Sequence, residues 1–180
     1  MNNFATIELV QKYRKVTYYT ISINEETTLF QQFINKHTNS NYDKLYHIIR
    51  WIEVIGDKIG ALDQYFRNEA EIADTRALPP KGVDREPIYV EIDDATEEEH
   101  NKPNNLRLYC FKANESVVFL FNGDIKTSRR AQDCDSVRPH FKVANTLSKL
   151  IEEAFINKDI RWNKSYTDII VDEHFLLKWE

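Results

Sequence analysis

The stretch from Leu106 to Ile125 has the hydrophobic pattern of two neighbouring strands in the centre of a β-sheet. Residues 106–111 alternate Leu, Arg, Leu, Tyr, Cys, Phe, which predicts a strand with one apolar face and one amphipathic face. Residues 117–121 are all apolar, which is typical of a central strand buried on both faces. Asn122 and Gly123 follow, and both adopt positive φ easily. We therefore expect a turn or bulge there, with Ile125 and the following residues at a sheet edge.

Apolar residues at helical spacing predict two helices that form a hairpin on one face of this sheet. The first covers residues 42–55, and Gly56 is placed to end it. The second covers residues 58–71. Its apolar stripe consists of Ile59, Leu62 and Phe66, and its solvent-facing residues are expected to be Arg67, Asn68, Glu69 and Glu71.

Residues 1–40 are interpreted as an N-terminal extension made of a hairpin and a helix. The hairpin strands are predicted near residues 4–10 and 16–23, where β-branched and aromatic residues are common. The helix is expected to begin after Asn24 and to end near His37.

Residues 41–180 are expected to form the core, so that the chain is a single α+β domain with an antiparallel sheet. Residues 88–92 are a further strand candidate. Pro139 fits the first turn of a helix that continues to about Asn157. Residues 160–162 and 169–171 then suggest a short terminal hairpin.

Composition indicates a globular protein, because 42% of the 180 residues are hydrophobic and 12% are aromatic. No apolar run has the length of a membrane span or a signal peptide. We therefore expect a cytoplasmic protein without a membrane partner. Cys110 and Cys134 are the two cysteines, and a reducing compartment would leave both as thiols.

The distribution of charge matters more than the net charge of −5. The acidic loop, residues 91–99, carries six carboxylates: Glu91, Asp93, Asp94, Glu97, Glu98 and Glu99. Residues 106–142 carry seven lysines and arginines against four acidic residues. Because binding follows local charge, this basic core is compatible with an RNA-facing surface. The acidic loop is either an ordinary solvated loop or a segment that folds over the basic core and inhibits it.

The core pattern resembles the RelE/ParE/HigB superfamily of bacterial toxins, and within it the phage-derived, HigB-like branch. The matching positions are Arg107, Tyr109, Phe111, the apolar strand 117–121, Gly123, Ile125, Lys126 and Thr127. The sequence departs from the family pattern at Asp124, where an aromatic residue is usual, and at Thr127, where a second lysine is frequent. The resemblance implies a RelE-like fold.

The resemblance also implies a function, namely the toxin of a type II toxin–antitoxin system. Such a toxin is a metal-independent endoribonuclease, linked to translation, in which the ribose 2′-hydroxyl of mRNA attacks the adjacent phosphate. Its partners would be a cognate antitoxin, typically a helix-turn-helix protein, and mRNA on the ribosome. No cofactor is implied.

The candidate site residues follow from this chemistry. Arg107 and Lys126 would stabilise the charge of the phosphate, because a guanidinium and an ammonium are good oxyanion partners. Tyr109 would stack on a base or take part in proton transfer. Lys112, Arg129 and Arg130 would hold the RNA backbone. No metal site is predicted, since the five histidines have no ligand spacing.

The same residues also have a structural interpretation. Arg107 and Tyr109 would then belong to the solvated face of a sheet, and Lys126 would be an edge-strand lysine that discourages strand pairing. The alternative function is a catalytically inactive, toxin-like module that binds another protein through its sheet or its acidic loop.

Overall fold

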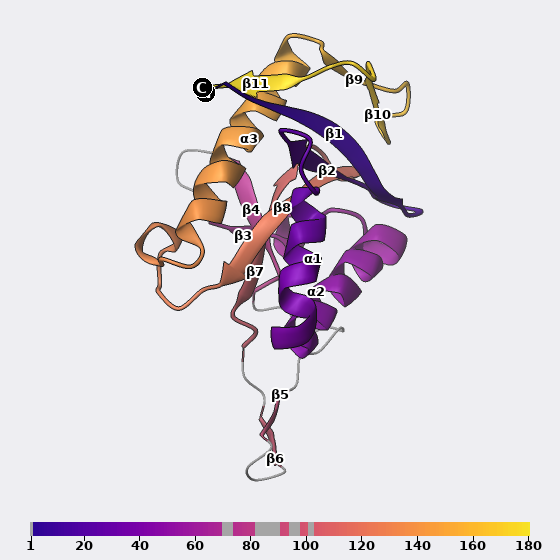
Figure 1. Ribbon diagram of the computed structural model, residues 1–180. Helices are drawn as coiled ribbons and strands as arrows, with labels where there is room; N and C mark the ends of the chain where they lie inside the picture. Colours follow the sequence, from indigo (N-terminus) through magenta and orange to yellow (C-terminus); the bar gives the residue numbers. More distant parts are fainter. Residues whose placement is uncertain (1, 70–73, 82–90, 94–97, 101–102) are drawn as a thin grey trace.

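The computed structural model describes residues 2–69, 74–81, 91–93, 98–100 and 103–180. It is a mixed α+β fold in which a large, mostly antiparallel sheet lies between two layers of helices (Figure 1). Helices α1 (Leu29–Ser40) and α2 (Tyr42–Val54) cover one face, and α3 (Arg138–Ile156) covers the other. The predicted α+β class is therefore confirmed.

The main sheet has seven strands in the order β11-β1-β2-β8-β7-β4-β3. Their bounds are β1 Asn3–Lys12, β2 Thr17–Ile23, β3 Arg67–Asn68, β4 Thr75–Leu78, β7 Leu106–Lys112, β8 Val117–Ile125 and β11 Leu177–Trp179. All neighbours pair antiparallel except β2 and β8, which are parallel. The sheet predicted to be antiparallel is therefore mixed, because β2 lies directly beside the central strand β8.

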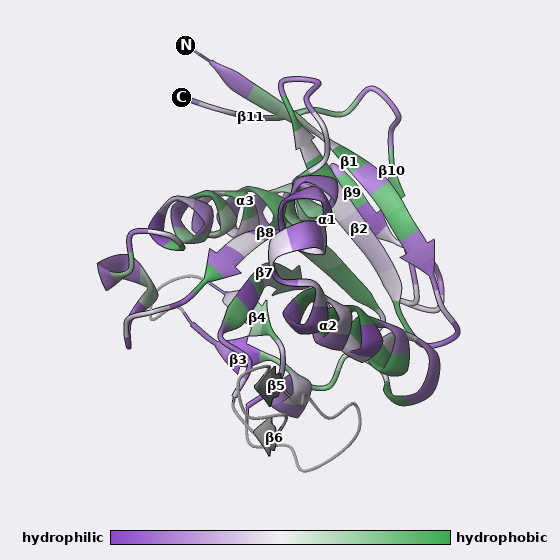
Figure 2. Cartoon of the chain, turned by 60° about the horizontal axis from the view of Figure 1, so that its bottom comes forward, coloured by the Kyte–Doolittle hydropathy of each residue, from purple (hydrophilic) through white to green (hydrophobic). Residues whose placement is uncertain are grey.

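The strands β7 and β8 are buried on both faces, as their apolar patterns predict. Leu106, Leu108 and Cys110 pack toward α1 and α2, while Tyr109 and Phe111 pack toward α3. Figure 2 shows the hydrophobic central strands between helices whose outer sides are hydrophilic. Burial on both faces explains why β8 has a continuous apolar sequence instead of an alternating one.

The bulge expected after residue 121 is present. The pairing of β7 with β8 changes register between Leu108 and Cys110, whose partners are Gly123 and Leu120. The strand β8 therefore has one additional residue at this point. Gly123 lies so close to β7 that a Cβ there would be 1.7 Å from the carbonyl oxygen of Arg107. Only glycine fits this backbone approach.

The helix predicted at residues 58–71 is wrong over residues 58–69, and residues 70 and 71 lie outside the described residues. The chain leaves α2 through a π-helical turn, Ile55–Ile59, and Gly60 then adopts φ +95°, which ends the right-handed helix. A 3-10 turn, Asp63–Tyr65, leads into the edge strand β3. The apolar residues in this segment reach the core from an irregular path, and Phe66 is 6% exposed.

The helix predicted from Asn24 begins later. Asn24 and Glu25 have φ of 50° and 62°, so they form a turn. The helix α1 starts at Leu29, and the hydroxyl of Thr28 accepts a hydrogen bond from the amide of Gln31. The helix that pairs with α2 is therefore α1, in place of the one expected at residues 58–71.

The N-terminal strands belong to the main sheet. The strand β1 pairs with both β2 and β11, and β2 joins the sheet centre through β8. Residues 1–40, expected as an extension, thus contribute two strands of the sheet and one of its covering helices. Figure 1 shows the N-terminal strand β1 beside the C-terminal strand β11.

The C-terminal predictions fit closely. The helix α3 begins at Arg138, one residue before Pro139, which was predicted to lie in its first turn. The strands β9 (Ile160–Trp162) and β10 (Ile169–Val171) form the expected hairpin. In the acidic loop, β5 (Glu91–Asp93) pairs antiparallel with β6 (Glu98–His100). The expected strand at residues 88–92 overlaps β5, and its residues 88–90 lie outside the described residues.

Candidate functional site

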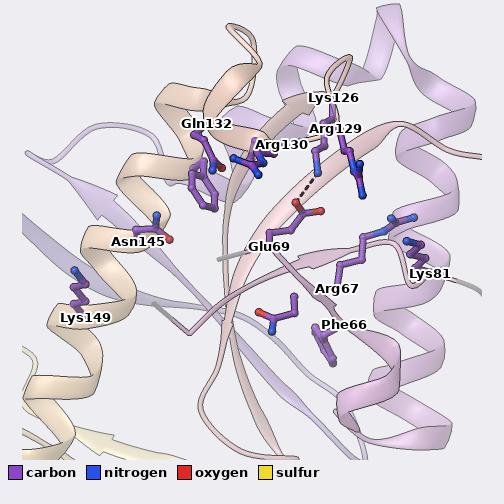
Figure 3. Close-up of a pocket in the computed structure, with 13 residues that line it drawn as sticks. Phe66, Arg67, Glu69, Lys81, Lys126, Arg129, Arg130, Gln132, Asn145 and Lys149 are labelled. Carbon is purple, nitrogen blue, oxygen red and sulfur yellow. Dashed lines mark hydrogen bonds and ion pairs between the residues drawn. The ribbon is translucent and has the colours of Figure 1, made fainter. Parts of the chain in front are cut away.

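A cavity of about 1040 Å³ lies where β3, the segment after β8 and α3 meet (Figure 3). The edge strand contributes one wall through residues 66–69, and residues 126 and 129–132 contribute another. The helix α3 supplies Phe141, Asn145 and Lys149, and Lys81 completes the lining. Segments far apart in the sequence therefore share one concave surface.

Positive charge dominates this cavity. Its lining includes six cations, namely Arg67, Lys81, Lys126, Arg129, Arg130 and Lys149, and one carboxylate, Glu69, among the described residues. A concave surface lined by one sign of charge concentrates ligands of the opposite sign. The cavity is therefore suited to an anionic ligand such as a phosphate chain.

Glu69 forms the centre of a buried ion-pair group. Its Oε2 lies 2.7 Å from Nζ of Lys126, and its Oε1 lies 3.5 Å from Nε of Arg107. The three side chains are only 8–10% exposed. Figure 3 shows the carboxylate of Glu69 and the ammonium of Lys126 directed toward each other. Three separate elements place these groups: β3, β7 and the end of β8.

Arg107 is held in place by its own strand. Its Nη1 donates to the carbonyl oxygens of Asn104 at 2.7 Å and Leu106 at 3.1 Å. Its Nε makes no hydrogen bond within the described part of the chain. Burial lowers the pKa of Arg107, and the carboxylate of Glu69 opposes this effect. The ordinary pKa of arginine lies so far above neutral pH that the guanidinium of Arg107 remains charged.

Arg67 is a second ordered guanidinium beside the cavity. Its Nε donates to the carbonyl oxygen of Pro79 at 2.7 Å. Burial and then the positive charge of Arg107 lower the pKa of Arg67 to about 10, which leaves it charged at neutral pH. Arg129 and Arg130, by contrast, are exposed and reach the cavity from the segment after β8.

Tyr109 lies behind the cavity, with no exposed surface. Its ring packs against Phe141 at a centroid distance of 5.6 Å and an interplanar angle of 60°. Its hydroxyl has no hydrogen-bond partner among the described residues. Burial raises the pKa of Tyr109 well above its ordinary value. This position leaves the ring no free face on which a base could stack.

Lys112 lies outside the cavity. It is at the other end of β7, where its Nζ is 2.5 Å from Oδ1 of Asp63. This ion pair lowers the pKa of the Asp63 carboxyl. Of the six residues selected from the sequence, Lys126, Arg129 and Arg130 line the cavity, and Arg107 joins Lys126 through Glu69. Lys112 and the hydroxyl of Tyr109 do not join them.

Sequence reasoning missed four charged members of this site: Glu69, Arg67, Lys81 and Lys149. Glu69 and Arg67 were expected on the solvated face of a helix that does not exist. Lys149 and Lys81 are single charges without a pattern in their neighbourhood. Among the cations of the cavity lining, only Lys126, Arg129 and Arg130 form a cluster that can be recognised in the sequence.

The acidic loop, residues 91–99, lies only partly within the described residues. Its strands β5 and β6 are defined as backbone, and residues 94–97 lie outside the described part. The hypothesis that the acidic loop covers the basic core therefore stays a prediction.

The described residues contain no group of three or more His, Cys, Asp or Glu side chains that could hold a metal ion. No helix among them is long and apolar enough to cross a membrane. Comparisons with protein-family models, curated proteins and solved structures found no match to this chain.

Proposed function

We propose that this protein binds RNA through the basic cavity and acts as a RelE-like toxin that cleaves mRNA without a metal. The observation that supports the proposal is the meeting of six cations around one cavity. Two of them, Arg129 and Arg130, were selected from the sequence as RNA-backbone contacts and are exposed at its wall. A third, Lys126, was selected for phosphate stabilisation.

The proposed reaction needs charge stabilisation and two proton transfers. The 2′-hydroxyl loses its proton to water as its oxygen forms a bond to phosphorus, the bond from phosphorus to the 5′-oxygen breaks, and the leaving oxygen takes up a proton from water. The products are a 2′,3′-cyclic phosphate and a 5′-hydroxyl. Cations beside the phosphate stabilise the negative charge that builds up on its oxygens. In this proposal Lys126 and Arg107 supply that stabilisation, and Arg129 and Arg130 hold the neighbouring phosphates.

The biological setting follows from the same proposal. The protein would act in the cytoplasm on mRNA engaged in translation. A cognate antitoxin, of the helix-turn-helix kind, would suppress its activity by covering the basic cavity. The alternative, a catalytically inactive module that binds a partner protein, is the outcome to be distinguished by experiment.

The test is induced expression in a bacterium, with growth followed and RNA 5′ ends mapped minutes after induction. Wild type is compared with the double variant Arg129→Ala, Arg130→Ala, because both side chains are exposed and their removal should not disturb the fold. The matched control is Arg161→Ala, Lys164→Ala, which removes two exposed cations outside the cavity lining. All variants are checked for equal expression.

We expect growth arrest and new 5′ ends with wild type and with the control, and neither effect with the cavity variant. Normal growth and unchanged RNA with all three proteins would contradict the toxin proposal and favour the protein-binding module.

A further inference from the structure

The carboxylate of Glu69 lies between two buried cations at the cavity. It contacts Lys126 at 2.7 Å and Arg107 at 3.5 Å, and its side chain is 8% exposed. Building on the proposed RNA binding, we infer that Arg107 and Lys126 form a phosphate site that Glu69 fills in the free protein. An RNA phosphodiester binds there by displacing the Glu69 side chain.

The guanidinium of Arg107 and the backbone of Lys126 are held independently of Glu69, whereas the ammonium of Lys126 contacts Glu69 itself. Arg107 is fixed by hydrogen bonds to two carbonyl groups of its own strand. The backbone amide of Lys126 donates to the carbonyl oxygen of Asn105 at 2.8 Å, which ties the end of β8 to the start of β7. The guanidinium of Arg107 and the backbone of Lys126 therefore stay in place when the carboxylate moves away. A preformed site binds a ligand without the cost of ordering its own side chains.

Arg107 also has unused capacity to donate a hydrogen bond. Its Nε is buried and lacks a hydrogen bond within the described residues, although Glu69 is near enough for an ion pair. A buried donor left without an acceptor costs free energy. A phosphate oxygen placed closer than the carboxylate oxygen would satisfy this donor.

Glu69 is attached to the least supported strand of the main sheet. The strand β3 is at the sheet edge and pairs with β4 through two residues, Arg67 and Asn68. Glu69 follows directly, so its side chain can rotate without breaking a strand pair. Short edge segments open at lower free energy than central strands.

The exchange conserves charge at the two buried cations. A phosphodiester and a carboxylate each carry one negative charge, so the summed charge at Arg107 and Lys126 is the same before and after binding. The net gain comes from the neighbouring phosphates, which meet Arg129 and Arg130 at the cavity wall. Glu69 therefore competes with RNA and weakens its binding.

The experiment uses the full chain and a fluorescent single-stranded 2′-O-methyl oligonucleotide, which binds but cannot be cleaved. Affinity is measured for wild type and Glu69→Gln. The matched control is Asp63→Asn, which removes one carboxylate from an ion pair with Lys112 outside the cavity. Because Glu69→Gln leaves two buried cations without a carboxylate, Glu69→Asp is added; it keeps the charge and shortens the reach. Thermal unfolding with increasing inorganic phosphate is recorded for every protein.

We expect Glu69→Gln to tighten oligonucleotide binding about tenfold, which lies in the lower part of the usual range for coupled sites. Glu69→Asp should tighten it less, and Asp63→Asn should leave it unchanged. Inorganic phosphate should raise the unfolding temperature of Glu69→Gln more than that of wild type.

Three outcomes are distinguishable. Equal oligonucleotide affinity in wild type and both Glu69 variants would overturn the inference and leave RNA binding intact. Unchanged affinity, together with loss of the new RNA 5′ ends when Glu69→Gln is expressed in the bacterial assay above, would overturn it in favour of Glu69 as a general base. Phosphate stabilisation of Glu69→Gln without oligonucleotide binding by any protein would support the phosphate site and overturn the proposed RNA function.

Discussion

The substitution Tyr109→Phe separates a catalytic role of this tyrosine from a structural one. The ring is fully buried against Phe141, and its hydroxyl has no hydrogen-bond partner among the described residues. The substitution removes only the oxygen atom and keeps the ring contacts. We therefore expect a more stable protein with unchanged RNA binding.

The magnitude follows from the desolvated hydroxyl. Burying a hydroxyl without a partner costs about 1–3 kcal/mol in proteins. Removing the hydroxyl recovers part of that cost, and the small void that it leaves in the core offsets some of this gain in stability. Tyr109→Phe should thus raise the free energy of unfolding by about 1 kcal/mol. For a chain of this size, this corresponds to a rise of roughly 2–4 °C in unfolding temperature.

Tyr18→Phe is the matched control, because Tyr18 is equally buried but has a partner. Its hydroxyl donates to the carbonyl oxygen of Ile52 at 2.8 Å. That carbonyl also accepts from the amide of Ile55, so it keeps one donor after the substitution. The loss of a single buried hydrogen bond should lower stability by about 1 kcal/mol.

The assay is urea unfolding followed by tryptophan fluorescence, with the slope of the transition compared between proteins. Opposite shifts of the two variants would support a purely structural role for Tyr109 behind the cavity. A destabilised Tyr109→Phe would refute the unpartnered hydroxyl, and a variant that loses oligonucleotide binding at full stability would return Tyr109 to the functional site.

Two further predictions concern the fold. Gly123→Ala should destabilise by about 3 kcal/mol or more in urea unfolding, because its Cβ would be 1.7 Å from a carbonyl oxygen of β7. Gly60→Ala is strained only by the backbone φ of +95° and should lower the free energy of unfolding by about 1 kcal/mol. Equal losses of stability in the two variants would contradict the close approach of Gly123 to β7. Burial lowers the pKa of His37 below its ordinary 6.5, although Asp124 opposes this effect. As the pH falls, His37 is therefore protonated in the unfolded chain before it is protonated in the folded one. The free energy of unfolding should be highest above pH 6.5 and should fall below it, and His37→Gln should weaken this dependence.

Patterns of neighbouring residues predicted those helices and strands whose position depends on local sequence. The continuous apolar run of β8, the helical spacing of α2 and the proline near the start of α3 each specify their element within a few neighbouring residues. The helix prediction for the segment after α2 was wrong. Ile59, Leu62 and Phe66 have helical spacing, but Gly60 adopts a backbone conformation outside the right-handed helix. A two-residue strand such as β3 is too short to leave any pattern.

The candidate site was predictable only where its residues are neighbours in sequence. Lys126, Arg129 and Arg130 form a visible basic cluster after a strand. Glu69 joins them because β3 pairs at the far edge of the sheet, and Lys149 joins because α3 crosses that face. Such contacts depend on tertiary packing, and no spacing along the chain encodes them.

The central claim, that the basic cavity binds RNA, is tested most directly by the salt dependence of oligonucleotide affinity. For single strands, the logarithm of affinity falls with the logarithm of salt by about 0.7 per phosphate contacted. Removing Arg129 and Arg130 together should therefore weaken binding and make this slope shallower by about 1.4, while Arg161→Ala, Lys164→Ala keeps the wild-type slope. Equal effects of the two double variants would contradict the claim, because binding would then depend on net charge and not on the cavity.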